Sequence, residues 1–137
     1  MGNAEDQLAV IAVATRYGTA VDTKDWEALA SCFAPDGVLH FPNRDMRGPA
    51  EIVAAIQAAT VSRTWQQHLL GSFQVKVSGD AATSRCSLQA LQVDASDPSK
   101  ALVTAGVYTD RLERRDGQWL IVDRRLEVGF TGVIPHS

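Results

Sequence analysis

Two residues in this sequence have the types that form an acid–base pair. Asp22 lies at the end of the first helical segment, on its apolar side, and His68 opens the run HLLGSFQVKV. A carboxylate among apolar side chains needs a partner, because burying an unpaired charge is costly. Histidine is the partner that makes chemistry, since a carboxylate can fix the tautomer of an imidazole that works as a general base. We therefore interpret His68 as the base and Asp22 as the residue that orients it.

Both residues also have a simpler interpretation. Asp22 can be an exposed carboxylate just past the helix end, although Asp25 already suits the N-cap of the next helix. Strict alternation along the strand directs Phe73 toward the core and groups His68 with the outward residues. His68 therefore reaches the interior only if the strand contains a bulge, for which Gly71 is well placed. Without that bulge His68 is a surface residue.

A tyrosine and an arginine are the further candidates for the site. Tyr17 shares the apolar helix face with Asp22, so it is either a hydrogen-bond donor in a pocket or a core aromatic, and Tyr108 has the same ambiguity. Arg124 and Arg125 are adjacent late in the last strand, so one of them faces the interior. An inward arginine needs an anion, either Asp22 or a negative charge that develops on a substrate. The other interpretation is a solvated cation on the outer face or at an oligomer interface.

Other chemistry finds little support in the sequence. His40 is interpreted as structural, and His136 is one residue from the C-terminus. Cys32 and Cys86 fit no metal spacing. The dinucleotide, P-loop, zinc-protease and serine-hydrolase motifs are absent from the sequence. We expect no metal and no cofactor.

Hydrophobic periodicity predicts the elements that hold these residues. Residues 4–21 repeat with a helical period, a short second helix follows Asp25, and Gly48-Pro49 opens a third helix. Residues 34–37 (APDG) read as a turn before a strand at 38–41. From residue 65 onward the period becomes two, which predicts long antiparallel strands at about 65–77, 82–94, 101–113 and 118–129. This order predicts one α+β domain over residues 1–137, with helices laid on a curved sheet and a pocket between the layers.

Composition limits the partners of the protein. The apolar content of 45% and charged content of 21% are ordinary globular values, and the net charge is −3. Without a basic cluster we expect no nucleic-acid partner. Since no apolar run approaches about 18 residues and the N-terminus is polar, we expect no membrane association and a cytoplasmic protein with reduced thiols.

Four segments, in order along nearly the whole chain, resemble the SnoaL-like branch of the nuclear-transport-factor-2-like superfamily. They are RYGTAVDTKDWEALASCFAPDGVL, GPAEIVAAI, QQHLLGSFQVKVSGDAATSRC and AGVYTDRLERRDGQWLIVDRRL. The resemblance implies a cone-shaped α+β barrel, in which N-terminal helices pack on a strongly curved, mostly antiparallel sheet and enclose a pocket. It also implies that His68 faces this pocket and that the chain forms a homodimer or homotrimer.

Within this superfamily the local motifs are similar to those of lyases. The spacing of Tyr17 and Asp22 resembles bile acid 7α-dehydratase, while Asp22 followed by His68 resembles hexachlorocyclohexane dehydrochlorinase and scytalone dehydratase. Arg124 is the nearer match to the arginine that completes those sites. The chain also departs from them: the dehydrochlorinase has a lysine in place of Tyr17. The strand RCSLQALQVD lacks the second histidine or aspartate of the dehydratases, since Asp94 comes too late.

These features predict a cofactor-free lyase or isomerase that acts on a small, largely apolar substrate such as a polyketide, steroid or aromatic intermediate. Elimination of water is the first choice of reaction, with His68 and Asp22 as the acid–base pair and Tyr17 and Arg124 steadying the leaving group or an enolate-like oxygen. A polyketide cyclase would use nearly the same groups. The alternative is a non-catalytic module of the same fold that binds a hydrophobic ligand or serves in oligomerisation. The aromatic residues expected to contact the ligand are Trp26, Phe33, Phe41, Trp65 and Tyr108.

Overall fold

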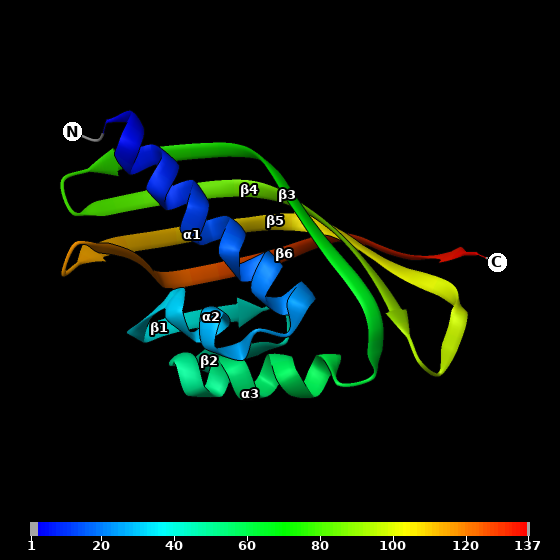
Figure 1. Ribbon diagram of the computed structural model, residues 1–137. Helices are drawn as coiled ribbons and strands as arrows, with labels where there is room; N and C mark the ends of the chain where they lie inside the picture. The colour runs from blue at the N-terminus through cyan, green and yellow to red at the C-terminus, as the bar shows by residue number, and fades with distance from the viewer. Residues whose placement is uncertain (1–2, 137) are drawn as a thin grey trace.

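Three helices and a six-stranded sheet make up the computed structural model, which describes residues 3–136 (Figure 1). The helices are α1 (Ala4–Thr23), α2 (Trp26–Ser31) and α3 (Pro49–Thr60). The strands are β1 (Phe33–Phe41), β2 (Arg44–Arg47), β3 (Arg63–Ser78), β4 (Ala81–Asp94), β5 (Asp97–Arg115) and β6 (Gln118–Pro135).

The helix boundaries follow from local chemistry. The side chain of Asn3 accepts a hydrogen bond from the backbone N–H of Asp6 and caps α1. Asp25 caps α2 by accepting from the N–H of Ala28 at 3.1 Å, so the N-cap predicted from the sequence is confirmed. Pro49 occupies the first turn of α3, where its missing N–H costs nothing.

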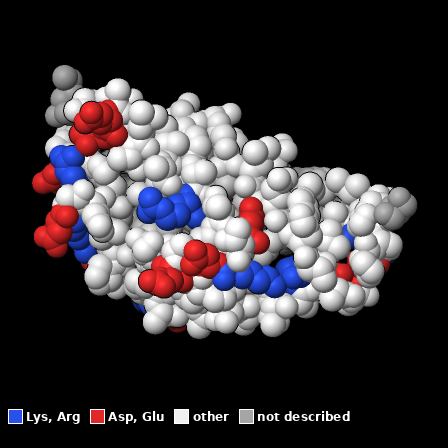
Figure 2. Space-filling model, viewed as in Figure 1, with Lys and Arg blue, Asp and Glu red and all other residues white. Residues whose placement is uncertain are grey.

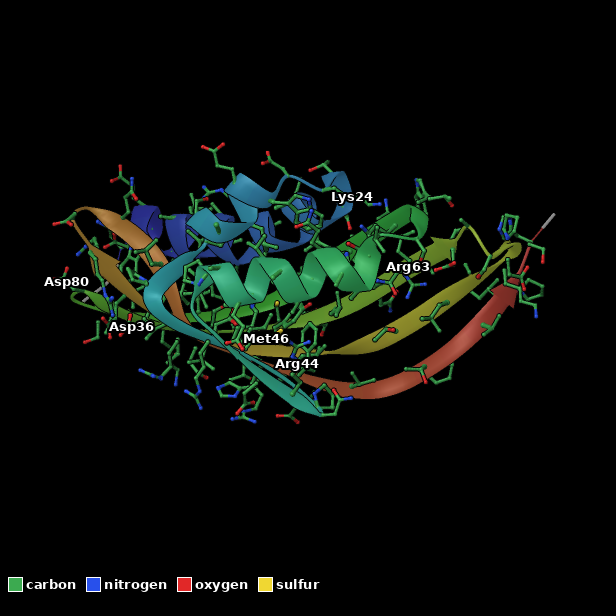
Figure 3. All side chains as sticks on the ribbon, turned by 90° about the horizontal axis from the view of Figure 1, so that it is seen from below. Lys24, Asp36, Arg44, Met46, Arg63 and Asp80 are labelled. Carbon is green, nitrogen blue, oxygen red and sulfur yellow. The ribbon has the colours of Figure 1, made fainter. Side chains whose placement is uncertain are left out.

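The sheet has the strand order β2-β1-β6-β5-β4-β3 and is open, with β2 and β3 at its edges. Every pairing is antiparallel except that of β1 with β6. The helices cover one face, and the far ends of β4, β5 and β6 extend beyond them (Figure 1). Seen from below, with α3 running across the view, the sheet curves beneath the helical layer (Figure 3). The predicted α+β fold of helices on a curved, mostly antiparallel sheet is confirmed.

The first two strands differ from the sequence prediction. Strand β1 runs from Phe33 to Phe41 and includes residues 34–37, which the APDG signal predicts as a turn. These residues nevertheless interrupt the regular pairing, because the register between β1 and β6 shifts between Phe33 and Val38. Strand β2 was not predicted; it is only four residues long and mostly polar, so it carries no apolar alternation.

The core lies between α1 and the sheet. The stripe of α1 that contains Val10, Ala14, Tyr17 and Val21 is buried, whereas Leu8, on the neighbouring stripe, is 66% exposed. Burying a large apolar side chain contributes about 1.5–3 kcal/mol, so this stripe fixes how α1 lies on the sheet. No helix within residues 3–136 has the length and apolar character needed to cross a bilayer. On the face shown in Figure 2, acidic and basic side chains are interspersed.

Candidate active site

Asp22 and His68 are in direct contact. Nδ1 of His68 lies 2.6 Å from Oδ1 of Asp22, and the backbone N–H of His68 donates to Oδ2 of the same carboxylate at 2.8 Å. The side chain of Asp22 is 18% exposed and that of His68 is 9% exposed. An ionised carboxylate only accepts hydrogen bonds, so Nδ1 carries the proton of the neutral ring and Nε2 is left with a free lone pair. The pairing that the residue types suggested is therefore present, with both oxygens of Asp22 committed to His68.

A β-bulge turns His68 toward the interior. In the β3–β4 pairing Gly71 lies opposite Ser87 and Gln74 opposite Arg85, so two residues of β3 face one residue of β4. Ser72, inside the bulge, has a left-handed φ of 53°. The extra residue reverses the alternation and puts His68 on the same face as Phe73. The bulge predicted next to Gly71 is confirmed, although the left-handed residue is Ser72.

A glycine lets the helix come close enough to the strand for this contact. A Cβ added to Gly18 on α1 would lie 3.1 Å from Cβ of His68 and 3.3 Å from Cδ1 of Leu70. Such distances are tighter than ordinary side-chain packing allows, so a larger residue would push α1 away from β3. Since Asp22 is one helical turn beyond Gly18, the close approach at Gly18 brings the carboxylate within reach of the imidazole.

A cavity of about 200 Å³ lies beside the pair. Its wall is built from α1, α3, β1, β3, β4, β5 and β6, and most of the wall is apolar, including Val21, Ile56, Leu88 and Leu126. His68 is part of this wall, and within residues 3–136 its Nε2 makes no hydrogen bond. A larger hollow of about 380 Å³, between α1 and the β5–β6 turn, is lined by neither histidine nor carboxylate among the described residues. The groups that can do chemistry therefore meet in the smaller cavity.

Two tyrosines supply hydrogen-bond donors to the cavity. Tyr17 and Tyr108 both line it, and their rings meet edge to face with centroids 5.6 Å apart. Burial raises the pKa of Tyr17 to about 12 and raises the pKa of Tyr108 well above its ordinary value. Both hydroxyls therefore keep their protons at neutral pH and can donate to an oxygen of a bound molecule.

Arg124 faces inward, but it does not line the cavity. The fully buried guanidinium donates to Asp110 through Nε at 2.7 Å and Nη2 at 2.8 Å, and Nη2 also donates to the carbonyl of Ala14. It lies 4.2 Å from the ring centre of Tyr108 and 4.7 Å from that of Tyr17. The sequence hypothesis that Arg124 contacts the leaving group is not matched by this geometry. The carboxylate of Asp110 neutralises the charge of Arg124, and the guanidinium packs against the two tyrosine rings.

Asp110 is a buried charged residue that the sequence reasoning missed. It lies directly across from Arg124 in the β5–β6 pairing and is 1% exposed. The signal was present, because alternation along β5 puts Asp110 on the same face as Tyr108 and Leu112. An inward arginine needed an anion, and the anion is on the neighbouring strand. Arg125 points to the exposed side of β6.

The aromatic residues expected to contact a ligand divide into two groups. Phe41 and Tyr108 line the cavity. Phe33 is buried against Tyr17, and Trp26 packs against the core, so neither reaches the cavity wall. Trp65 is 51% exposed, because its neighbour Gln66 takes the inward position on β3. The predictions for Trp26, Phe33 and Trp65 are therefore not matched by the structure.

Four polar residues of the cavity wall were not identified from the sequence: Thr60, Arg63, Gln92 and Thr104. Gln92 continues the inward series of Leu88 and Ala90 on β4, so alternation could have found it. Arg63 could not be found in this way, because the register shifts between Arg63 and Trp65.

The remaining histidine and cysteine candidates lie outside the cavity wall. Nδ1 of His40 is 2.7 Å from Asp45 and Nε2 is 2.7 Å from Asp123, which fits the structural interpretation. Burial lowers the pKa of His40, but the hydrogen bonds with both carboxylates outweigh it and raise the pKa above 6.5. Burial raises the pKa of Cys32 and Cys86 to about 11, so both remain protonated thiols. The part of the chain that the structure describes contains no group of three His, Cys, Asp or Glu residues arranged to hold a metal.

Comparison with known proteins gives a consistent picture of the fold. A family model described as a SnoaL-like domain matches residues 2–125. Rv2910c of Mycobacterium tuberculosis, an uncharacterized protein, is 29% identical over 125 residues, with 89% of this chain and 84% of the relative covered. The structure of Rv3472 of M. tuberculosis, a protein of unknown function, aligns with a TM-score of 0.84 and 30% identity over 93% of this chain and 78% of that one. The hexachlorocyclohexane dehydrochlorinase LinA-type3 of Novosphingobium barchaimii aligns with a TM-score of 0.87 and 18% identity over 97% and 94% of the two chains.

Proposed function

The chain belongs to the family of SnoaL-like domains, and on that premise we propose that it is a cofactor-free lyase or isomerase with His68 as its general base. The observation that carries the proposal is the contact between Asp22 and His68 at the wall of an apolar cavity. Structural neighbours of the chain include a dehydrochlorinase, which supports a lyase-like chemistry for the fold. We further propose that the reaction is a dehydration and that the substrate is small.

In the proposed reaction, His68 starts an elimination next to a carbonyl group. Nε2 takes a proton from the carbon beside the carbonyl, and Asp22 stabilises the imidazolium that forms. The hydroxyls of Tyr17 and Tyr108 donate to the oxygen on which negative charge develops. When the carbon–oxygen bond of the β-hydroxyl breaks, the departing hydroxide takes the proton back from Nε2 and leaves as water. The base is regenerated, and neither an oxidant nor a metal takes part.

The individual contributions have familiar magnitudes. A positioned general base accelerates proton transfer by about 10²–10⁴-fold. Each well-placed donor to a developing oxyanion adds about 10²–10³-fold. His68 and the two tyrosines together are therefore sufficient for a useful rate, provided the cavity holds the substrate carbon near Nε2.

The size of the cavity favours a small substrate. Its volume is about 200 Å³, and an apolar cavity of about 150 Å³ is known to hold benzene. We therefore propose a substrate with one ring and short substituents. This favours the aromatic intermediate over a four-ring steroid among the classes that the sequence suggested.

A screen of neutral one-ring β-hydroxy ketones tests the proposal. We expect the protein to convert 3-hydroxycyclohexanone or 3-hydroxy-1-phenylpropan-1-one to the unsaturated ketone, detected by mass spectrometry as loss of water. His68→Gln should lower the rate by about a hundredfold or more, while His136→Gln, a matched change on the exposed side of the molecule, should leave it unchanged. Equal rates in wild type and His68→Gln would rule out His68 as the base.

A hydrophobic-ligand carrier is the second candidate function. It is favoured by the absence of any carboxylate from the described wall of the cavity and by the mutual neutralisation of Arg124 and Asp110. A carrier has no need for an acid–base pair, so it predicts either that Asp22 and His68 are apart, which the 2.6 Å contact contradicts, or that their replacement leaves ligand affinity little changed. A carrier that retains the contact should bind the ketones without conversion, and His68→Gln should not change their affinity.

A further inference from the structure

Arg63 is a cation in the cavity wall that the proposed reaction does not use. It opens β3 just after the C-terminal end of α3, where Figure 3 shows it at the same end of the molecule as Lys24. Among the described residues that line the cavity, Arg63 is the only lysine or arginine. A guanidinium keeps its charge at any physiological pH, so one part of the mostly apolar cavity wall carries a positive charge.

The guanidinium of Arg63 has unused donors. Its Nε is buried and has no hydrogen-bond partner among the residues that the structure describes. Its ion pair joins Nη1 to Oδ2 of Asp94 at 3.6 Å, which is too long for a hydrogen bond. The edge of the guanidinium formed by Nε and Nη2 points away from Nη1, so it is not the edge that faces Asp94. A buried N–H without an acceptor is costly, which indicates that this edge is completed by something else.

Asp94 has other partners that hold it in place. Its Oδ2 accepts from the hydroxyl of Ser62 at 2.6 Å, and its Oδ1 accepts from the N–H and the hydroxyl of Ser96 at 3.0 and 2.8 Å. These hydrogen bonds, that of Ser62 first, lower the pKa of Asp94 to about 2. Asp94 is therefore an ionised group fixed by serines, and it makes no hydrogen bond to the Nε–Nη2 edge of Arg63.

We propose that Arg63 is the substrate-binding residue for a carboxylate, and that the substrate is a one-ring carboxylic acid whose reacting carbon lies at His68. The proposal rests on the proposed function for the position of that carbon, but the carboxylate subsite stands on the arginine alone. Nε–H and one Nη2–H are parallel, which is the geometry that binds the two oxygens of a carboxylate. A phenyl or cyclohexyl ring then fills the apolar part of the cavity.

The spacing of Arg63 and His68 suits a short molecule. The two residues are five positions apart on one strand, so their Cα atoms are separated by about 16 Å at most, at roughly 3.3 Å per residue. Both residues line the cavity, so the gap between their functional groups is shorter than the separation of their Cα atoms. A ring with a side chain of two or three carbons bridges what remains.

Calorimetric binding of 3-phenylpropanoate and of its neutral amide, 3-phenylpropanamide, tests the subsite. We expect wild type to bind the acid more tightly than the amide, and Arg63→Gln to weaken the acid about tenfold or more with little effect on the amide. Arg44→Gln removes the same charge from an exposed position on β2, outside the cavity, and should change neither affinity. If Arg63→Gln does not fold, Arg63→Lys keeps the charge without the parallel donors and should give an intermediate affinity for the acid.

The outcomes separate this inference from the proposed reaction. His68→Gln should keep the preference for the acid; if it loses the preference, the carboxylate binds at the histidine and the proposal for Arg63 is overturned. Wild type that binds both probes equally, or an arginine variant that binds the acid as wild type does, overturns it as well. If the protein binds the acid through Arg63 but converts no ketone, the carboxylate subsite is supported and the proposed lyase reaction is refuted. If it converts ketones but shows no preference for the acid, the lyase reaction is supported and the subsite is refuted.

Discussion

Replacing Asp22 by asparagine should reverse the tautomer of His68. Oδ2 of Asp22 accepts from the backbone N–H of His68, and Oδ1 accepts from Nδ1. Asparagine has one oxygen, and the backbone N–H can only donate, so the oxygen must stay opposite it. The amide NH₂ then faces Nδ1, which has to give up its proton and become an acceptor. The proton moves to Nε2, and the lone pair that serves as the base disappears from the cavity.

The magnitude follows from the alternative orientation of the amide. If the asparagine oxygen faced Nδ1, two N–H donors would point at each other across the 2.8 Å now occupied by a hydrogen bond. An unsatisfied buried N–H costs about 1–3 kcal/mol, which is roughly a 5- to 150-fold preference for the reversed tautomer. The same substitution in a serine-protease triad lowers kcat by about 10⁴-fold through the wrong tautomer. We expect the dehydration rate of Asp22→Asn to fall by about 5- to 150-fold from the reversed tautomer alone, with the protease value of about 10⁴-fold as the upper bound.

Long-range ¹H–¹⁵N correlation spectra of histidine-labelled protein at pH 8.5 measure the tautomer without any substrate. We expect His68 to be protonated at Nδ1 in wild type and at Nε2 in Asp22→Asn. Asp25→Asn makes the same change at the exposed cap of α2 and should leave the spectrum of His68 as in wild type. An Asp22→Asn protein that still carries the proton on Nδ1 would refute the reasoning.

Three other properties follow from the structure. Asp110→Ala should lower the free energy of unfolding in urea by about 3–5 kcal/mol, because it leaves the buried Arg124 unpaired; the double change Asp110→Leu with Arg124→Met should cost much less, and a single-variant loss below about 1 kcal/mol would contradict a dominant ion pair. The raised pKa of His40 contributes stability that is complete below the ordinary pKa of 6.5 and is lost as pH rises through the raised value. His40→Gln should therefore destabilise the protein more at pH 5.5 than at pH 8.5 in urea titrations, whereas an equal loss at both would exclude the linkage. We also propose that the outer face of the sheet mediates a homodimer or homotrimer. Leu69 and Phe130, 64% and 59% exposed, lie in one cross-strand row of that face, which is typical of an interaction surface; light scattering should show an oligomer that Leu69→Glu converts to monomer, and a monomeric wild type would disprove it.

Much of the fold was predictable because periodicity reports which side of an element is buried. Alternating residues gave the four long strands, and the Asp25 cap and Gly48-Pro49 gave the helix starts. Strand β2 was not predictable, because its four residues are mostly polar and exist as a strand only through pairing with β1. Tertiary pairing of this kind leaves no local pattern in the sequence.

The candidate site was predicted in part, and the limits are physical. Asp22 could be singled out because a carboxylate on an apolar face is costly, and this cost is visible in one helix. The direction of His68 depended on the bulge near Gly71, which a sequence can allow but not fix. The role of Arg124 required knowing which anion lay across from it. Asp110 sits on another strand, so only the β5–β6 register decides that pairing.

The central claim is that His68 removes a proton from carbon with the help of Asp22. Proton NMR in D₂O measures this step directly, as exchange of the hydrogens beside the carbonyl in the neutral one-ring ketones, with no leaving group required. We predict that wild type accelerates the exchange over buffer and that His68→Gln and Asp22→Asn return it to the buffer rate. Exchange at the buffer rate in wild type, or unchanged acceleration in His68→Gln, would contradict the account.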